Sequence, residues 1–160
     1  MLASSRLTVG IHILTLLALN RAESLTSEYI AGSVNTNPVV VRRVLGALRR
    51  ARLVTSQGGN GGGWRLVGEP SEISLSDVYG AVEDDQLFPL HHRPPNPDCP
   101  VGRYIGATLE ERFAATRDVL KADLARSTIA SMLDEVKARA RTFVLSLCPG
   151  LLDSKKEKIK

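Results

Sequence analysis

The sequence predicts a mostly α-helical fold with one small β-hairpin. Apolar residues recur every three or four positions in three successive N-terminal segments, which is the spacing of one helix face. A glycine-rich stretch then separates two short apolar runs, as in two strands joined by a turn. Helical spacing returns near the C-terminus. At 160 residues, the chain is long enough for one domain with an appendage.

The first two helices are expected at 5–20 and 27–34. Thr26 suits the N-cap of the second helix, because its hydroxyl can accept a hydrogen bond from an amide of the first turn. Glu28, in that turn, complements the helix dipole. The apolar stripe of the first helix consists of Leu7, Ile11, Leu14 and Ala18.

The third helix, expected at 38–51, has one apolar face and one basic face. Asn37 suits its N-cap, and Pro38 suits its first helical position. At 100° per residue, the apolar face should pack against the first two helices. The inward face holds Val41, Val44, Leu45 and Leu48; the outward face holds Val39, Arg43, Gly46 and Arg50, flanked by Arg42 and Arg49.

A β-hairpin is expected next, with strands at 53–56 and 64–67. Glycine loops that bind nucleotide phosphates end in Gly-Lys-Ser/Thr or lead from a strand into a helix. Loop 57–63 joins two strands instead, so the tip of a hairpin is the better interpretation. Trp64 should anchor the hairpin on the helices. Three helices followed by a hairpin is the order of a winged helix-turn-helix domain, expected at 1–83.

The rest of the chain follows as one short helix and three regions. Ser74 and Asp77 form a capping box that begins a helix ending near residue 83. The proline-rich residues 84–101 are expected to be an irregular linker or sensor loop. Residues 102–146 should form two dimerisation helices, followed by a flexible basic tail at 147–160.

The first dimerisation helix carries an apolar stripe that a domain this small offers little core to cover. A long helix with one apolar stripe must bury it to be stable. Pairing with a second copy is the simplest solution, so the sequence predicts a homodimer. The expected interface residues are Ile105, Leu109, Phe113 and Leu120.

Composition excludes several classes of protein. No apolar run reaches the roughly 18 residues of a membrane-spanning helix, and the N-terminus lacks the pattern of a secretory signal. Two cysteines cannot build a disulfide framework, so a cytoplasmic location is expected. Aromatic residues, at 4%, are too few for a stacking platform on single-stranded nucleic acid. No nucleophile–base arrangement indicates an enzyme, and no motif indicates a cofactor.

Arginines concentrate in and just after the third helix. The formal net charge is only +4, but five arginines lie between positions 42 and 52 with no acid among them. On the third helix of a winged-helix order, this predicts contact with double-stranded DNA. Arg42 and Arg43 are placed for base edges, and Arg49 and Arg50 for phosphates. Further expected DNA contacts are Arg6, Thr26, Ser27, Asn37, Val39 and Asn60.

The motifs, in their order and spacing, resemble the Rrf-two-type family of bacterial winged-helix transcription regulators. The resemblance covers about residues 3–140. It implies a homodimer that crosses its long helices and binds a palindromic operator with two winged-helix heads, most often as a repressor. The matching stretches are LTSEYIA at 25–31, NP at 37–38, LVTS at 53–56, GGGWRL at 61–66 and ISLSDV at 73–78.

Three departures from the family pattern bear on the mechanism. Cluster-binding members carry three cysteines before the long helix, whereas this chain has Cys99 alone there, in a PDCPVG stretch similar to the YwnA-like branch. Because an iron–sulfur cluster needs mostly thiolate ligands, no cluster is expected. The wing lacks the arginine that relatives insert into the minor groove, and Arg52 stands where relatives often place a helix-ending glycine.

Cys99 is the candidate sensor of a signal. It precedes a helix N-terminus, where amide dipoles favour a thiolate, so its oxidation is one hypothesis and an inert, packed cysteine is the alternative. His91, His92 and Cys99 could instead hold zinc or copper in a metal-responsive regulator. A winged helix that binds another protein is a further alternative, and it predicts an apolar or mixed outward face on the third helix.

Overall fold

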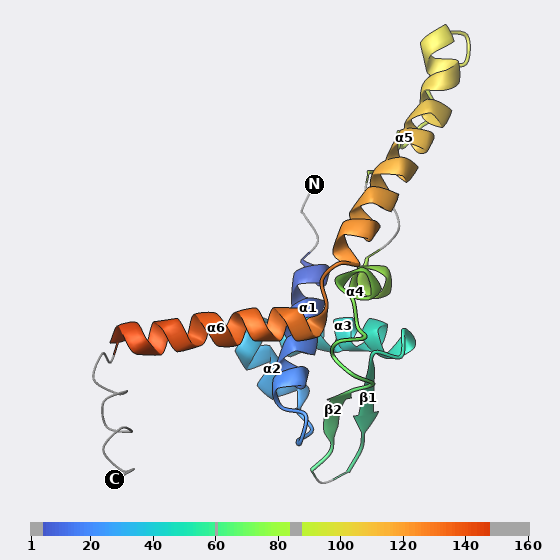
Figure 1. The fold of residues 1–160 in the computed structure, drawn as a ribbon. Helices are drawn as coiled ribbons and strands as arrows, with labels where there is room; N and C mark the ends of the chain where they lie inside the picture. The colour runs from blue at the N-terminus through green and yellow to red at the C-terminus, as the bar shows by residue number, and fades with distance from the viewer. Residues whose placement is uncertain (1–4, 60, 84–87, 148–160) are drawn as a thin grey trace, which may run out of the picture.

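The computed structural model describes residues 5–59, 61–83 and 88–147, the last six by their backbone alone. A head formed by the first four helices and the hairpin carries two longer helices, which leave it in different directions (Figure 1). The elements are α1 Arg6–Leu19, α2 Ser27–Val34, α3 Pro38–Arg50, β1 Val54–Gln57, β2 Gly63–Leu66, α4 Leu75–Val82, α5 Pro100–Leu124 and α6 Ile129–Leu147. The predicted winged helix-turn-helix order is confirmed.

Side chains cap three helices where the sequence predicts it. Thr26 Oγ1 accepts a hydrogen bond from the amide three residues on, at 3.2 Å. Asn37 Oδ1 accepts one from the amide of Val39 at 2.8 Å, and Pro38 occupies the first helical position. Ser74 and Asp77 form the predicted capping box, with reciprocal hydrogen bonds of 3.1 and 2.8 Å. These bonds fix where α2, α3 and α4 begin.

The core of the head lies between α1, α3, α4 and the start of α6. The predicted inward face of α3 is confirmed, since each of its four residues is at most 2% exposed. Isoleucines and leucines from α1 and α2 meet this face, and the burial of such side chains is the main force that holds the helices together. The largest fully buried side chains are Ile13, Leu14, Leu17, Ile30, Val41, Leu45, Leu48, Val54, Val78 and Ile129.

The helix α3 ends in a left-handed turn at Arg52, whose φ is 60°. The amide of Arg52 donates to the Arg49 carbonyl, and the amide of Leu53 donates to the Leu48 carbonyl, both at 3.0 Å. This is the hydrogen-bond pattern of a Schellman motif, which favours glycine because a Cβ is crowded at positive φ. A non-glycine residue here therefore stores a small backbone strain in the head.

The hairpin is antiparallel, and each strand is shifted by one residue from its expected position. Trp64 extends the sheet by exchanging backbone hydrogen bonds of 3.0 and 2.8 Å with Leu25, the residue before the N-cap of α2. A Cβ on Gly63 would lie 2.8 Å from the Leu25 carbonyl oxygen, so glycine is required for this close approach. The wing is thus fastened to the start of α2.

A second contact holds the wing at its base. Arg21 and Glu69 form an ion pair with a shortest N–O distance of 2.5 Å. Hydrogen bonding from Arg21, and then its charge, lower the pKa of Glu69, and the same hydrogen bond raises the pKa of Arg21. Both groups are exposed to solvent, so the pair orients the two turns more than it stabilises the fold.

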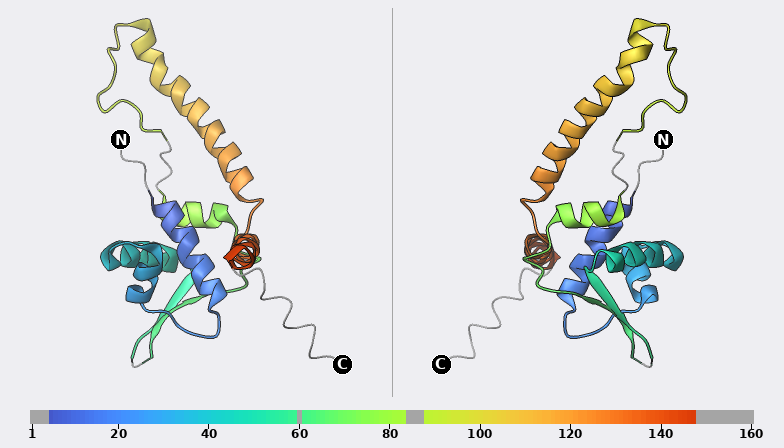
Figure 2. Two further views of the ribbon diagram at one scale, coloured as in Figure 1. Left: turned by 90° about the vertical axis from the view of Figure 1, so that its left-hand side faces the viewer. Right: turned by 90° about the vertical axis from the view of Figure 1, so that its right-hand side faces the viewer.

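The helix α5 begins at Pro100, two residues before its expected start. Proline suits the first helical position, and Cys99 therefore becomes the N-cap residue. Residues 88–99 contain no helix or strand, in agreement with the expected linker, while 84–87 lie outside the described residues. Figure 2 shows the segment 88–99 rising along α5 to the start of that helix.

The helix α6 joins the head, although the sequence grouped it with α5 in the region 102–146. Ile129 is fully buried in the core of the head, and its amide donates to the Ile73 carbonyl at 2.9 Å. Leu133, one turn later, is also part of this core. Of the expected tail 147–160, Leu147 ends α6 and the rest lies outside the described residues. None of the described helices combines the length and apolar character needed to cross a bilayer.

Candidate nucleic-acid interface

The outward face of α3 is exposed and basic, with one apolar side chain. Val39 is 49% exposed, and Arg43 and Arg50 are exposed one and three turns along. Within the described residues, neither of these arginines has an ion pair or hydrogen bond. Gly46 lies between them, and a Cβ there would meet only the end of the Arg50 side chain, at 3.9 Å. No described part of the chain occupies this face.

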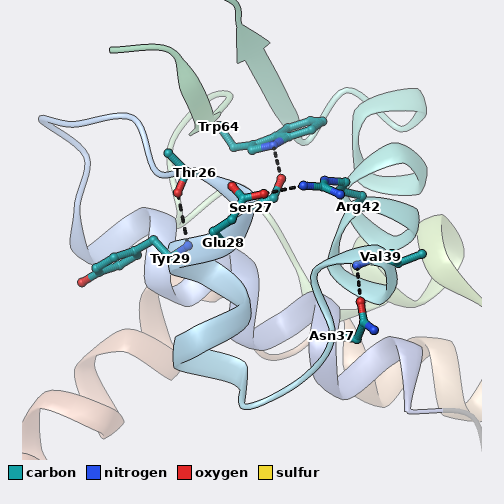
Figure 3. A network of polar contacts seen from close by, with 8 residues as sticks. All are labelled: Thr26, Ser27, Glu28, Tyr29, Asn37, Val39, Arg42 and Trp64. Atoms are coloured by element: carbon teal, nitrogen blue, oxygen red, sulfur yellow. Dashed lines mark hydrogen bonds and ion pairs between the residues drawn. The ribbon is translucent and has the colours of Figure 1, made fainter. Parts of the chain in front are cut away.

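Arg42, on the flank of α3, is paired with an acid of α2. Its guanidinium donates a hydrogen bond to Glu28 Oε1 across the helix-turn-helix (Figure 3). The sequence predicts Arg42 as a DNA contact but assigns Glu28 only to the dipole of α2, so this partner was missed. The sequence contained a clue to this ion pair, because Glu28 is the last acidic residue before position 69 and therefore the acid nearest to Arg42 in the sequence.

Arg49, on the same flank, is held against the wing. Its guanidinium carbon lies 5.9 Å from the centre of the Trp64 ring, which is within the range of a cation–π contact. One of its nitrogens also lies 3.4 Å from the Ser56 hydroxyl on β1. The wing therefore orients one of the two arginines that the sequence assigned to phosphates.

The side chain of Ser27 faces inward, so a phosphate contact of this residue stays a prediction for its backbone amide alone. It is 8% exposed, and its hydroxyl accepts a hydrogen bond of 3.1 Å from the indole N–H of Trp64. Figure 3 shows this bond beside the Glu28–Arg42 pair. Burial of a polar side chain requires such a partner, which only the folded wing supplies. The hydroxyl of Ser27 therefore joins α2 to the wing, and Trp64 is confirmed as the anchor of the hairpin.

Arg6 is brought next to the arginines of α3. It lies at the start of α1 and lines a groove of about 630 Å³ together with Arg43 and Arg50. Glu83, at the end of α4, fixes this corner by accepting a hydrogen bond of 3.1 Å from the Leu7 amide. Thr26 and Asn37 use their side-chain oxygens as caps, and Asn60 lies outside the described residues.

The proposed sensor and metal residues lie apart from this interface. Cys99 is exposed at the N-cap of α5, and His91 and His92 are exposed in the preceding segment. Among the described residues, no three His, Cys, Asp or Glu side chains come close enough together to hold a metal ion. The alternative of a site formed by His91, His92 and Cys99 therefore has no support in the geometry.

The expected dimer stripe on α5 is partly covered within one subunit. Its four residues, Ile105, Leu109, Phe113 and Leu120, are all half-buried. Part of the cover comes from Phe88, whose ring centre lies 4.8 Å from that of Phe113. A different face of α5 is the open one: Val101, Tyr104 and Val119 are 67%, 64% and 71% exposed.

Comparison with known proteins places this architecture in a family. Residues 3–135 match the Rrf2 family, described as an iron-dependent transcriptional regulator. YwnA of Bacillus subtilis (strain 168), a candidate HTH-type transcriptional regulator, is 42% identical over 134 residues, which cover 83% of this chain and 98% of YwnA. A crystal structure of a candidate DNA-binding protein is 39% identical, with a TM-score of 0.66, over 81% of this chain and 99% of that one. CymR (YrzC), the global cysteine regulator of B. subtilis, has the same fold at 22% identity, with a TM-score of 0.61 over 84% and 98% of the two chains.

The residues of this chain do not fit an iron–sulfur cluster, despite the description of the family. Such clusters are held mostly by cysteine thiolates, and the whole sequence contains two cysteines. Cys99, in the described part, has no second thiol or cluster of acids and imidazoles around it.

The family assignment rests on matches along most of both chains. The relatives are described as regulators of transcription, not as enzymes. Their fold, with three helices, a wing and a long helix, is the one described above. The chain therefore belongs to the Rrf2 family of winged-helix, DNA-binding transcriptional regulators.

Proposed function

We infer that the protein is a cytoplasmic homodimer that represses transcription by binding a palindromic operator through α3. The observation that carries this inference is the outward face of α3, where Arg43 and Arg50 stand unpaired among the described residues beside Val39. A helix with such a face fits the major groove, and two heads related by a two-fold axis read two half-sites.

The residues of this face have different roles at the DNA. Arg43 lies in the second turn of α3, and it donates to the paired acceptors of a guanine edge. Val39, one turn earlier, contacts the methyl group of a thymine. Arg50, at the end of α3, and Arg6, across the groove from it, bind backbone phosphates. Arg49 tracks the backbone on the side of the wing.

The wing contributes less than in relatives that carry an arginine there. Its tip has glycines at 58, 59, 61, 62 and 63, with Gln57 as the polar side chain that the structure describes. The wing therefore approaches the sugar–phosphate backbone through its amides and leaves the minor groove unread. Sequence specificity then rests on α3.

The helix α5 forms the dimer. The open face around Val101, Tyr104 and Val119 needs a cover that the described residues of one subunit do not supply. A second α5, crossing the first, supplies it symmetrically and also closes over the half-buried stripe. Obligate interfaces of this kind bury on the order of 2,000 Å² or more.

The role of α3 as the DNA-recognition helix is tested by reversing the charge of two of its arginines. DNA sequences bound by the wild type are first selected from a random duplex library, which defines the operator. Replacing Arg42 and Arg43 by glutamate should abolish binding to the selected operator. Arg139→Glu with Arg141→Glu makes the same change in charge on exposed residues of α6, and this control should retain most of the affinity. Operator binding that survives in the α3 variant contradicts the inference and favours a protein-binding role for α3.

Single substitutions distinguish an arginine that contacts a base from one that contacts a phosphate. Arg43→Ala should cost about 1–3 kcal/mol of operator binding and relax the preferred sequence at one position. Arg50→Ala should weaken all sequences alike and reduce the slope of log affinity against log salt by about one unit. Equal losses on operator and unrelated DNA for Arg43→Ala would remove it from base recognition.

Thiol oxidation is the signal that the exposure of Cys99 favours. Its sulfur lies at the joint between the linker and α5, where a sulfenic acid or mixed disulfide changes charge and volume. That change tilts the heads relative to the dimer axis and spoils the half-site spacing. Operator affinity before and after diamide, for wild type and Cys99→Ser, tests this. A wild type that binds equally well in both states excludes Cys99 as the switch.

A further inference from the structure

Glu28 is an acid in a place where the proposed function does not explain it. No Asp or Glu occurs from position 29 to 68, the stretch that forms α3 and the wing. Glu28 lies at the edge of this basic surface with its side chain 62% exposed. A carboxylate there repels DNA phosphates, and its favourable interaction with the dipole of α2 would be served equally by acids on the far side of that helix.

Glu28 contacts one arginine of α3, Arg42. Glu28 Oε1 accepts a hydrogen bond from the guanidinium of Arg42, 14 residues away on the next helix. The Arg42 side chain is itself 55% exposed, so the pair stands in solvent at the surface that meets DNA. Among the four basic side chains of α3, Arg42 is the one that an acid neutralises in the described structure.

We propose that Glu28 is a positioning residue that holds Arg42 on the flank of α3 and thereby limits the affinity of the protein for its operator. The proposal rests on the proposed function, because it requires α3 to be the reader. Without DNA, the carboxylate holds the guanidinium on the flank of α3. At the operator, Arg42 leaves Glu28 for the paired acceptors of a base.

The exchange works because the two competitors for Arg42 differ in strength. An exposed ion pair is weak, since water screens both charges. A guanine edge offers two acceptors in the geometry of the guanidinium fork, and it displaces the carboxylate. An unrelated sequence offers only phosphates, so Arg42 can stay with Glu28 there, whereas at the operator the whole ion pair is broken. Glu28 therefore lowers the affinity for the operator at least as much as the affinity for other DNA, and it limits how tightly the protein binds its operator.

The neighbouring contacts hold the pair in register. Ser27, next to Glu28, is fixed by the Trp64 indole, so the first turn of α2 cannot rotate away from α3. The guanidinium of Arg49 lies over the ring of the same indole. Figure 3 shows Glu28 and Arg42 directed toward one another between α2 and α3, beside this anchor.

The test measures DNA affinity in a double-mutant cycle. Wild type, Glu28→Gln, Arg42→Gln and the double variant are titrated with the selected operator and with a scrambled duplex, over a series of salt concentrations. Glu28→Gln should bind the operator about three- to tenfold more tightly and increase the salt slope by about one unit. Affinity for the scrambled duplex should rise by no more than affinity for the operator. In the Arg42→Gln background, the same change should raise operator affinity by less than about twofold, the small gain expected from removing one exposed negative charge.

Two controls separate this mechanism from plain electrostatics and from a structural tie. Glu135→Gln removes an exposed acid from α6 and should leave the operator affinity unchanged. Equal thermal midpoints for wild type and Glu28→Gln show that the fold is intact. The proposal is overturned if Glu28→Gln binds the operator as the wild type does, or if its full gain in operator affinity persists without Arg42. If α3 is not the DNA-recognition helix, the proposed function itself is wrong. That outcome is recognised separately, because Arg43→Ala then binds the operator as tightly as the wild type does.

Discussion

The head and the long helix α5 bury their apolar side chains to very different extents. In the head, the 13-residue α3 buries four residues. The 25-residue α5, which is described along its whole length, buries none. The reason is that one face of α3 packs against α1, α2 and α4. In contrast, α5 leaves the head (Figure 1), and Figure 2 shows the segment 88–99 beside it.

This difference indicates where each region gets its stability. The head has its own core, so its winged-helix geometry is set within one chain. An isolated long helix in water is marginal, and most helical stability comes from the packing of an apolar face. The open face of α5 is therefore expected to be covered by a second subunit, as proposed above. We therefore expect substitutions in the head to act on folding, and substitutions on the open face of α5 to act on assembly.

The largest expected effect is loss of the dimer. Tyr104→Asp with Val119→Asp places four charges in the proposed two-fold interface, where their desolvation is not compensated. Sedimentation should show a monomer at micromolar concentration, with the near-ultraviolet signal of Trp64 unchanged because the head stays folded. A variant that remains dimeric would exclude the open face and leave the stripe around Leu109 and Phe113 as the interface.

The second largest expected effect is on stability, and it compares the truncation of a buried side chain in the head with that of an exposed side chain on α5. Leu48→Ala, at a fully buried position of α3, should lower the free energy of unfolding by about 2–5 kcal/mol. Val119→Ala, 71% exposed in one subunit, should change the stability of the head by less than about 0.5 kcal/mol. Urea unfolding at one fixed protein concentration, followed by Trp64 fluorescence, compares the two. Similar losses would mean that α5 and the head unfold as one unit.

The third comparison uses two helical glycines that have room for a side chain. Gly46→Ala in α3 and Gly106→Ala in α5 should each stabilise the fold by about 0.5–1 kcal/mol, because no backbone or core atom opposes the added methyl group. Only Gly46→Ala should weaken operator binding, by about 1–3 kcal/mol, if α3 seats closely on DNA. Unchanged binding would mean that the DNA stays clear of the middle of α3.

The smallest expected effect concerns the residues that end α3 and α5. Arg52→Gly should stabilise the head by about 1 kcal/mol, because glycine relieves the positive φ after α3. Ala125, the C-cap of α5, has an ordinary φ of −67°, so Ala125→Gly should destabilise by about 0.5–1 kcal/mol. Thermal midpoints of the two variants should therefore move in opposite directions. A loss of stability in Arg52→Gly would show that the Arg52 side chain has a packing role.

Parts of the interface could be predicted because they depend on nearby residues. Thr26, Asn37 and Ser74 cap amides two or three residues away, so their roles follow from local spacing. The inward and outward faces of α3 follow from the turn of the helix alone. The hairpin followed from its glycines, with the bounds of each strand off by one residue, because local propensity does not fix the exact residue at which a strand ends.

The sequence by itself thus determined the winged-helix order, the starts of α2, α3 and α4, and the basic face of α3, since hydrogen bonds and periodicity within a few residues encode them. Only the tertiary structure decided that Arg42 meets Glu28, that Trp64 turns Ser27 inward from 37 residues away, and that α6 joins the core of the head. Each of these contacts joins separate elements. Which side chains meet there depends on how whole helices pack, a choice that no single segment of the chain contains.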